Sequence, residues 1–255
     1  MTIDRIYRAR QGMGSRYVLE RDGAFYWLGG DIFGDYWPGL EIARDEPLRW
    51  LAPVRPSIVV CIGLNYKDHA EEMKKKLPEE PLVFLKPPTT VIGPEEPIRL
   101  PDWAGRIEHE AEMAVVIGRT ASRVSAADAM QYVLGVTCLC DVTARELQQK
   151  DVQYSRAKGF DTFAPMGPCI AVGLDPSQLA VEGWVNGERR HASNTNQLIF
   201  PVPQLIAHVT RFMTLQPGDV LTTGTPSGVG PLVPGDRMMV KVEGVGTLAN
   251  PCIAG

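Results

Sequence analysis

Three glutamates alternate along the segment IEHEAEMAVVIG (107–118): Glu108, Glu110 and Glu112. In a β-strand, side chains two residues apart point to the same face, and here that face continues into apolar residues. The spacing therefore predicts carboxylates that are drawn toward a core. Because burying an unpaired carboxylate is costly, a bound cation or a raised pKa must make this arrangement tolerable. The solvated acidic end of an edge strand is the alternative.

Asp141 directly follows the apolar run GVTCLC (135–140), where a buried strand would deliver its side chain into a cleft. Together with glutamates of the preceding segment it would offer three hard oxygen ligands, which suit Mg²⁺ or Mn²⁺ better than Zn²⁺. An octahedral ion held by three carboxylates keeps positions free for water and substrate. A 2-oxo acid, which binds through two oxygens, requires such open positions.

His69 and Glu72 lie three residues apart in NYKDHAEEMKKKLPEE (65–80), which we expect to form a short exposed helix that acts as a lid. Residues at this spacing share one helix face. The carboxylate can therefore orient the imidazole and raise its basicity, which makes His69 a candidate general base for water. An ordinary surface histidine is the alternative.

Two further segments contain residues suited to binding an anionic substrate. Lys158 lies in SRAKGFDTFAP among aromatic and apolar neighbours, where a partly buried ammonium could stabilise an oxyanion; a surface lysine is the alternative. The loop TTGTPSGVG (222–230) is rich in glycine but lacks the GK[ST] ending of a phosphate loop. We expect it to offer backbone donors and the Thr225 hydroxyl to a carboxylate.

Strands must position most of these residues. Short β-branched or apolar runs separated by Gly and Pro predict strands, and such runs occur in AEMAVVIG, GVTCLCD, DVLTTGTP, DRMMVKVEG and GTLANPC. Helices are expected over 126–134, after a capping box that begins at Ser125, and from Pro203 onward. Residues 1–55 form a predicted β-rich module, in which Asp22-Gly23 marks a two-residue hairpin. The Pro-punctuated segment 51–57 places the boundary with a second domain, 56–255.

Composition excludes several classes of protein. The chain has 255 residues, a net charge of −4 and 44% hydrophobic residues, which is typical of an ordinary globular protein. No basic stripe suggests nucleic-acid binding, and no apolar stretch is long enough for a membrane span. Five scattered cysteines and the lack of a signal-like start favour reduced thiols and a cytoplasmic location.

Six blocks in this order resemble the fumarylacetoacetate hydrolase family: GLNYKDHAEEM, VFLKPPT, HEAEMAVVIG, CDVTARELQ, AKGFDTFAPMGP and LTTGTPSGVG. The resemblance covers residues 56–255. It implies an α+β, strand-rich fold, the mixed β-sandwich roll of that family, here with the small N-terminal module added. It also implies a homodimer.

The resemblance assigns roles residue by residue. The metal carboxylates match Glu110, Glu112 and Asp141, and the catalytic residues match His69, Glu72 and Lys158. The substrate-binding residues match Arg145, Gln148, Thr225 and, from the block VFLKPPT, Lys86. Some family members supply a fourth carboxylate ligand from the segment before the lid; this sequence has no clear equivalent, and Glu108 is a possible substitute.

The implied function is that of a Mg²⁺- or Mn²⁺-dependent enzyme acting on 2-oxo or 2,4-dioxo acids through a metal-bound enolate. The His/Glu dyad favours hydrolytic C–C cleavage of an acylpyruvate-type substrate. The alternatives are a 2-hydroxyhepta-2,4-diene-1,7-dioate isomerase and a decarboxylase of an oxaloacetate-type diacid, both in aromatic catabolism. A non-enzymatic binding scaffold is a remote alternative.

Overall fold

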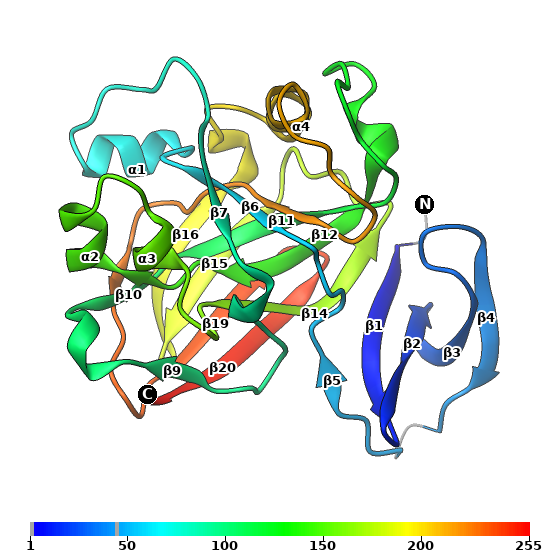
Figure 1. The fold of residues 1–255 in the computed structure, drawn as a ribbon. Helices are drawn as coiled ribbons and strands as arrows, with labels where there is room; N and C mark the ends of the chain where they lie inside the picture. The colour runs from blue at the N-terminus through cyan, green and yellow to red at the C-terminus, as the bar shows by residue number, and fades with distance from the viewer. Residues whose placement is uncertain (1–2, 44–45) are drawn as a thin grey trace.

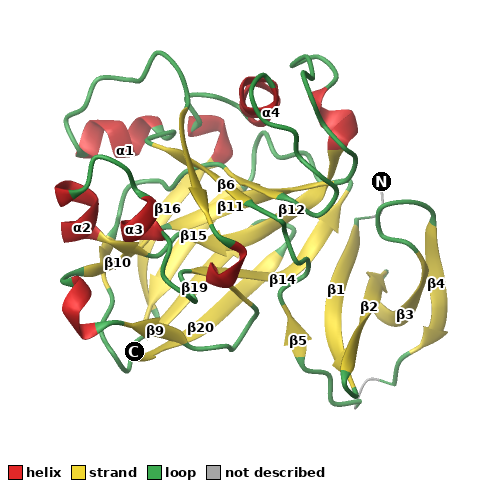
Figure 2. Cartoon of the chain, viewed as in Figure 1, coloured by secondary structure: helices red, strands yellow, loops and turns green. Residues whose placement is uncertain are grey.

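The computed structural model describes residues 3–43 and 46–255, and strands dominate it (Figures 1 and 2). The N-terminal part contains β1 (Asp4–Gln11), β2 (Gly14–Arg21), β3 (Ala24–Gly30), β4 (Tyr36–Glu41) and β5 (Trp50–Leu51). Asp22 and Gly23 join β2 to β3 with φ angles of 53° and 80°. Two successive residues in the left-handed region are typical of a two-residue hairpin turn, so the predicted hairpin is confirmed.

The N-terminal strands are joined to the rest of the molecule through one large sheet. Strand β1 pairs antiparallel with β14, with Asp4 opposite Val172. From β1 the sheet continues through β14 (Ala164–Val172), β12 (Val133–Cys140), β11 (Ala111–Ile117), β17 (Val220–Thr222), β6 (Val59–Gly63) and β7 (Leu82–Lys86), with β8 (Val91–Ile92) paired to β14. Although the N-terminal module stands to one side in Figure 1, it shares this sheet with the second domain.

A second sheet packs against the large one. It contains β16 (Glu188–Asn194), β15 (Ala180–Val185), β19 (Arg237–Val242), β20 (Gly246–Ala254) and β9 (Ile98–Leu100). The main apolar core lies between the sheets, where Met113 and Val115 of β11 join Val181 and Val240 of the second sheet. A small third sheet contains β13 (Thr143–Ala144), β10 (Ile107–His109) and β18 (Gly230–Pro231). The strand-rich mixed architecture predicted from the sequence is thus confirmed.

Helices are short and cover the edges of the sheets. They are α1 (Lys67–Glu72), α2 (Arg145–Lys150), α3 (Ser155–Lys158) and α4 (Val202–Thr210), with 3-10 turns η1 (Pro88–Thr90), η2 (Asp102–Ala104), η3 (Ala129–Tyr132) and η4 (Thr195–Gln197). Figure 1 shows α1, α2 and α3 grouped on one side of the molecule. Among the described residues, no helix is long and apolar enough to cross a membrane.

The helix predicted over 126–134 is wrong. The capping contact at Ser125 forms, with the Ser125 hydroxyl donating to Asp128 Oδ2 at 2.7 Å. Only the single turn η3 follows it, because Val133 already belongs to strand β12, which packs in the large sheet. Pairing with β11 and β14 therefore overrides the local helical preference.

Candidate active site

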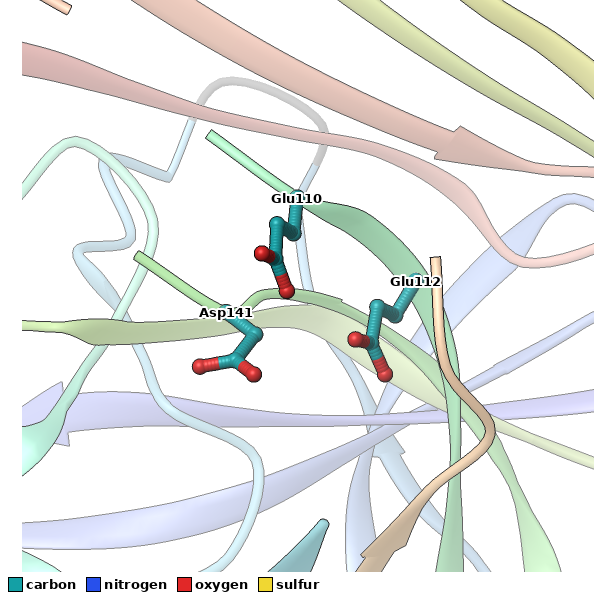
Figure 3. A group of neighbouring side chains, drawn as sticks. All are labelled: Glu110, Glu112 and Asp141. Atoms are coloured by element: carbon teal, nitrogen blue, oxygen red, sulfur yellow. The ribbon is translucent and has the colours of Figure 1, made fainter. Parts of the chain in front are cut away.

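Glu110, Glu112 and Asp141 form a buried carboxylate cluster at the end of two neighbouring strands (Figure 3). Glu110 precedes β11, Glu112 lies within it, and Asp141 follows β12. Because Ala111 pairs with Cys140, the register brings Asp141 opposite Glu110, whose carbonyl accepts the Asp141 N–H at 2.9 Å. One oxygen of each carboxylate lies within 4.8 Å of the others.

The three glutamates of the sequence motif do not share one continuous strand. Glu108 lies in β10, which belongs to the small third sheet, and the chain changes sheet at Glu110. Glu108 forms ion pairs with Arg106 at 2.6 Å and with Arg145 at 2.5 Å. The structure therefore uses Glu108 to hold Arg145, and the cluster of potential metal ligands contains the other two glutamates and Asp141.

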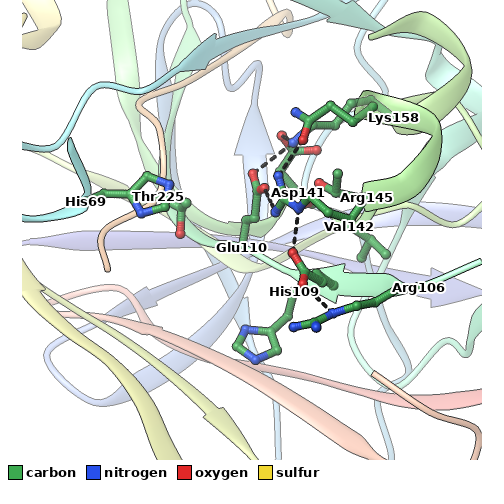
Figure 4. A network of polar contacts seen from close by, with 12 residues as sticks. His69, Arg106, His109, Glu110, Asp141, Val142, Arg145, Lys158 and Thr225 are labelled. Carbon is green, nitrogen blue, oxygen red and sulfur yellow. Dashed lines mark hydrogen bonds and ion pairs between the residues drawn. The ribbon is translucent and has the colours of Figure 1, made fainter. Parts of the chain in front are cut away.

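Three basic side chains surround the cluster (Figure 4). Lys158 Nζ lies 2.8 Å from Glu110 Oε2 and 2.6 Å from Asp141 Oδ2. Arg145 Nη2 lies 2.6 Å from Glu110 Oε1. Lys86 Nζ lies 2.5 Å from Asp141 Oδ1 and also donates to the Val142 carbonyl at 3.2 Å. Lys158 and Lys86 are both almost fully buried, so neither is a surface lysine.

Glu112 differs from its two neighbours in having no positive partner among the residues described. Its Oε2 accepts the Gly224 N–H at 2.9 Å. Burial, together with the nearby Asp141 and Glu110 carboxylates, raises the pKa of Glu112 well above its usual value. Burial also opposes the ionisation of Glu110, but Lys158 and Arg145 outweigh it and lower the pKa of that carboxyl.

A divalent cation fits this cluster for two reasons. The ligand atoms are all carboxylate oxygens, which Mg²⁺ and Mn²⁺ prefer. In addition, the lysines and Arg145 compensate the other two carboxylates but not Glu112. A cation held between the three carboxylates would compensate the charge on Glu112.

The predicted His–Glu pair forms on helix α1. His69 Nδ1 lies 3.0 Å from Glu72 Oε2, and the His69 side chain is only 12% exposed. If Nδ1 carries the proton that Glu72 accepts, the second ring nitrogen, Nε2, keeps its lone pair. Glu72 Oε1 in turn accepts the Gly228 N–H at 3.3 Å, so the pair is tied to the loop 222–230.

One cavity of about 110 Å³ joins the lid to the carboxylate cluster. His69 and Thr225 line it together with Glu110, Lys158, Arg145 and Gln148, and apolar or aromatic side chains complete the wall: Ile62, Leu64, Met73, Leu82, Phe84 and Tyr154. Six of the ten residues predicted for the site thus line this cavity, and a seventh, Glu72, contacts His69 at its edge. Glu112, Asp141 and Lys86 lie beneath it in the carboxylate cluster.

Two residues predicted to bind substrate are already engaged. Arg145 Nη1 donates to Gln148 Oε1, while its other nitrogens hold Glu108 and Glu110. The Thr225 hydroxyl donates to the Ala111 carbonyl at 3.0 Å. A substrate carboxylate that binds Thr225 would compete with that carbonyl for the same proton.

Sequence reasoning missed a buried chain of contacts behind the site. His191 Nδ1 lies 2.9 Å from the Ser227 carbonyl, and His191 Nε2 lies 2.9 Å from His109 Nδ1. Because a carbonyl only accepts, the proton on His191 must lie on Nδ1, and His109 then donates to His191. This chain connects the residue beside Glu110 to the loop that carries Thr225. The two histidines lie 82 residues apart, so no local pattern could have paired them.

Asn65 is a second residue that the motif search did not single out. Its side-chain amide donates to the Phe200 and Thr223 carbonyls at 3.0 and 2.9 Å, and its oxygen accepts the Phe200 N–H at 2.8 Å. Asn65 is fully buried at the start of the lid. It therefore fixes the base of α1 against the loop 222–230.

A cavity that brings a buried carboxylate cluster together with a histidine paired to a glutamate is a candidate active site. Residues 58–253 match the family model described as Fumarylacetoacetate (FAA) hydrolase C-terminal. The match spans more than half of the chain. The chain therefore belongs to the fumarylacetoacetate hydrolase family of enzymes.

Characterised and solved relatives carry different activities in their names. The mitochondrial oxaloacetate tautomerase of Rattus norvegicus is 42% identical over 226 residues, which cover 84% of this chain and 72% of that protein. The structure of a 2-hydroxyhepta-2,4-diene-1,7-dioate isomerase from Mycobacterium marinum is 38% identical, with a TM-score of 0.90 and 98% of each chain covered. A fumarylacetoacetate hydrolase from Exiguobacterium antarcticum is 32% identical, with a TM-score of 0.89, covering 99% of this chain and 100% of that one.

Proposed function

We propose that this enzyme moves a proton at the carbon beside the 2-oxo group of a small 2-oxo diacid, interconverting its enol and keto forms. The observation that carries the proposal is the single cavity of about 110 Å³ that joins His69 to the carboxylate cluster. Ligand sites commonly hold roughly 300 Å³ or more, so this cavity suits a compact acid of oxaloacetate size. The similarity to an oxaloacetate tautomerase supports the same substrate class.

In this proposal Glu110, Glu112 and Asp141 would hold a Mg²⁺ or Mn²⁺ ion. When bound, the ion supplies positive charge that stabilises negative charge on a substrate oxygen. The ammonium of Lys158, which lies against two of the three carboxylates, adds a second positive charge on the same side of the cavity. The residues of this chain then need only orient the acid and move a proton.

His69 is the proposed proton carrier. In the keto-to-enol direction its Nε2 takes the proton from the carbon beside the 2-oxo group, and the resulting imidazolium gives that proton to the 2-oxo oxygen; the enol-to-keto direction runs the same two transfers in reverse. Glu72 holds the ring by Nδ1 and stabilises the imidazolium that forms. Thr225 and Arg145, which also line the cavity, would orient the substrate carboxylates.

Hydrolytic C–C cleavage of an acylpyruvate, the reaction favoured from the sequence, is the second candidate. One observation supports it: Met73 of the lid and Leu82 of β7 add apolar surface to the cavity, beside the lid residue Lys75. That surface would suit an acyl group if the lid segment moved outward. In this case His69 would take its proton from an attacking water, and Lys158 would stabilise the oxyanion that results.

The test compares three reactions in one experiment, first with Mg²⁺ and then with EDTA. Loss of the oxaloacetate enol is followed by its absorbance, and pyruvate release is measured separately from oxaloacetate and from acetylpyruvate. We expect metal-dependent acceleration of enol loss, abolished by His69→Asn and kept by the matched control His208→Asn on α4. Pyruvate release from acetylpyruvate without faster enol loss would replace this proposal with the hydrolase, and release from oxaloacetate with the decarboxylase.

A further inference from the structure

Arg8 is a buried arginine that forms no ion pair with the residues that the structure describes, and it lies outside the carboxylate cluster. It lies on β1 two residues after Ile6, and residues two apart share a strand face. Ile6 on that face is fully buried in an apolar core, and Arg8 is only 7% exposed. Its Nε is buried without a hydrogen-bond partner among the described residues. A charged group in such a position is costly unless an anion compensates it.

Two cavities meet at Arg8. One, of about 360 Å³, lies between β1, β5 and the segment after η1, and Arg8, Arg10 and Arg55 line it together with apolar side chains such as Val54. The other, of about 230 Å³, is lined by Arg8, Arg55, Tyr17 and Ser15. Arg8 thus lines both cavities, at the junction between the N-terminal module and the second domain.

The charged residues around Arg8 add to the excess of positive charge at this junction. Burial, together with the nearby charge of Arg55, lowers the pKa of Arg8. Glu96 is the acidic residue that lines the larger cavity, but its Oε2 accepts the Gly93 N–H at 2.7 Å and its Oε1 lies 3.5 Å from Arg49 Nη2. Three arginines therefore face this space against one carboxylate that is already engaged.

We propose that Arg8, Arg10 and Arg55 form a binding site for a small oxyanion, a phosphate or a carboxylate, at this junction. Guanidinium groups bind both kinds of anion through paired, charge-assisted hydrogen bonds. The larger cavity has the volume of an ordinary ligand site. A bound anion would connect β1 of the module to the linker 51–57, which carries Arg55, and so hold the two parts together.

Thermal unfolding tests the site with inorganic phosphate and with malonate as separate probes, against chloride at the same ionic strength and with EDTA present. At about one hundred times Kd, we expect the wild-type Tm to rise by roughly 5 to 10 °C. The probe that gives the larger rise identifies the anion class. Arg55→Gln and Arg10→Gln, both at exposed residues, should lose most of this rise, while Arg211→Gln, at an exposed residue that lines neither cavity, should keep it.

Arg8→Met tests the proposed anion site most directly. Without an anion, it should be at least as stable as the wild type, because it removes an uncompensated buried charge, and neither probe should raise its Tm. A wild-type Tm that is indifferent to both probes would overturn the proposal. So would a rise that Arg55→Gln and Arg8→Met retain. If light scattering instead shows a wild-type dimer that Arg8→Met dissociates, a partner subunit supplies the counter-ion and the small-anion site is wrong.

Discussion

The floor and the lid of the cavity are built in opposite ways. In the floor, Glu110, Glu112 and Asp141 are almost fully buried, and two of them are held by lysines at 2.5 to 2.8 Å. In the lid, the Glu72 side chain is 47% exposed and α1 has a single buried residue, Ala70. The difference teaches that the sheets fix the positions of the buried carboxylates, whereas the proposed proton carrier, His69, lies on a helix with few buried contacts. Changes to the floor should therefore affect stability and activity, and changes to the lid should affect activity alone.

Asp141→Asn should produce the largest effect. It removes the carboxylate charge that Lys86 and Lys158 share, and breaking a buried pair commonly costs about 3 to 5 kcal/mol. Urea unfolding in EDTA should show this loss, and the metal-dependent activity should disappear. Asp151→Asn, at an exposed ion pair with Arg156, is the matched control and should change neither. Equal stability of the two variants would contradict the view that ion pairs with lysine stabilise the carboxylates of the floor.

His69→Asn should separate the lid from the floor. Loss of a general acid–base residue commonly lowers kcat by about 10² to 10⁴, and the unfolding midpoint should stay at the wild-type value. Steady-state kinetics and urea unfolding on the same preparation measure both. Glu72→Gln should fall between this variant and the wild type, because it keeps the base but weakens its orientation. A large drop in stability for His69→Asn would show that the lid also supports the fold.

Metal binding should stabilise the floor through Glu112. Mg²⁺ or Mn²⁺ at one hundred times Kd should raise the free energy of unfolding by about 2.7 kcal/mol. Because burial and the neighbouring carboxylates raise the pKa of Glu112, Glu112→Gln should stabilise the metal-free protein near neutral pH and abolish the response to metal. Denaturation midpoints with EDTA and with each metal give both quantities. A variant that still responds fully to metal would exclude Glu112 as a ligand.

At neutral pH the histidine chain between floor and loop should give the smallest effect, and its contribution becomes visible only as a pH dependence. Burial, with the nearby His191, lowers the pKa of His109 to about 3 from an ordinary value of 6.5. A lowered pKa means that the unfolded chain binds the proton more tightly, so stability is complete above 6.5 and is lost as pH falls toward 3. The loss should be about 1.4 kcal/mol per pH unit in this window. Urea unfolding between pH 4 and 7 should show a smaller slope for His109→Gln than for the control His208→Gln.

Much of the fold and site could be predicted from local patterns. The strand runs, the Asp22-Gly23 turn and the His69–Glu72 spacing each depend on residues within a few positions, and the structure contains all of them. The predicted helix over 126–134 failed for a tertiary reason, because pairing with two strands decides the state of Val133. The boundary near residue 55, the substrate and the homodimer stay predictions.

The sequence by itself determined which residue types could meet. Alternation put Glu110 and Glu112 on one side of the chain, and helix periodicity put His69 beside Glu72, because these periods are properties of the backbone. Only the tertiary structure decided the contacts between distant residues: the register of β11 on β12, the ion pair of Lys86 with Asp141 across 55 residues, and the burial of Arg8 Nε without a hydrogen-bond partner among the described residues. The reason is physical. Register between distant strands follows from packing of the whole core. Whether a buried group is ionised, and with which group it pairs, depends on the side chains that core packing brings close to it.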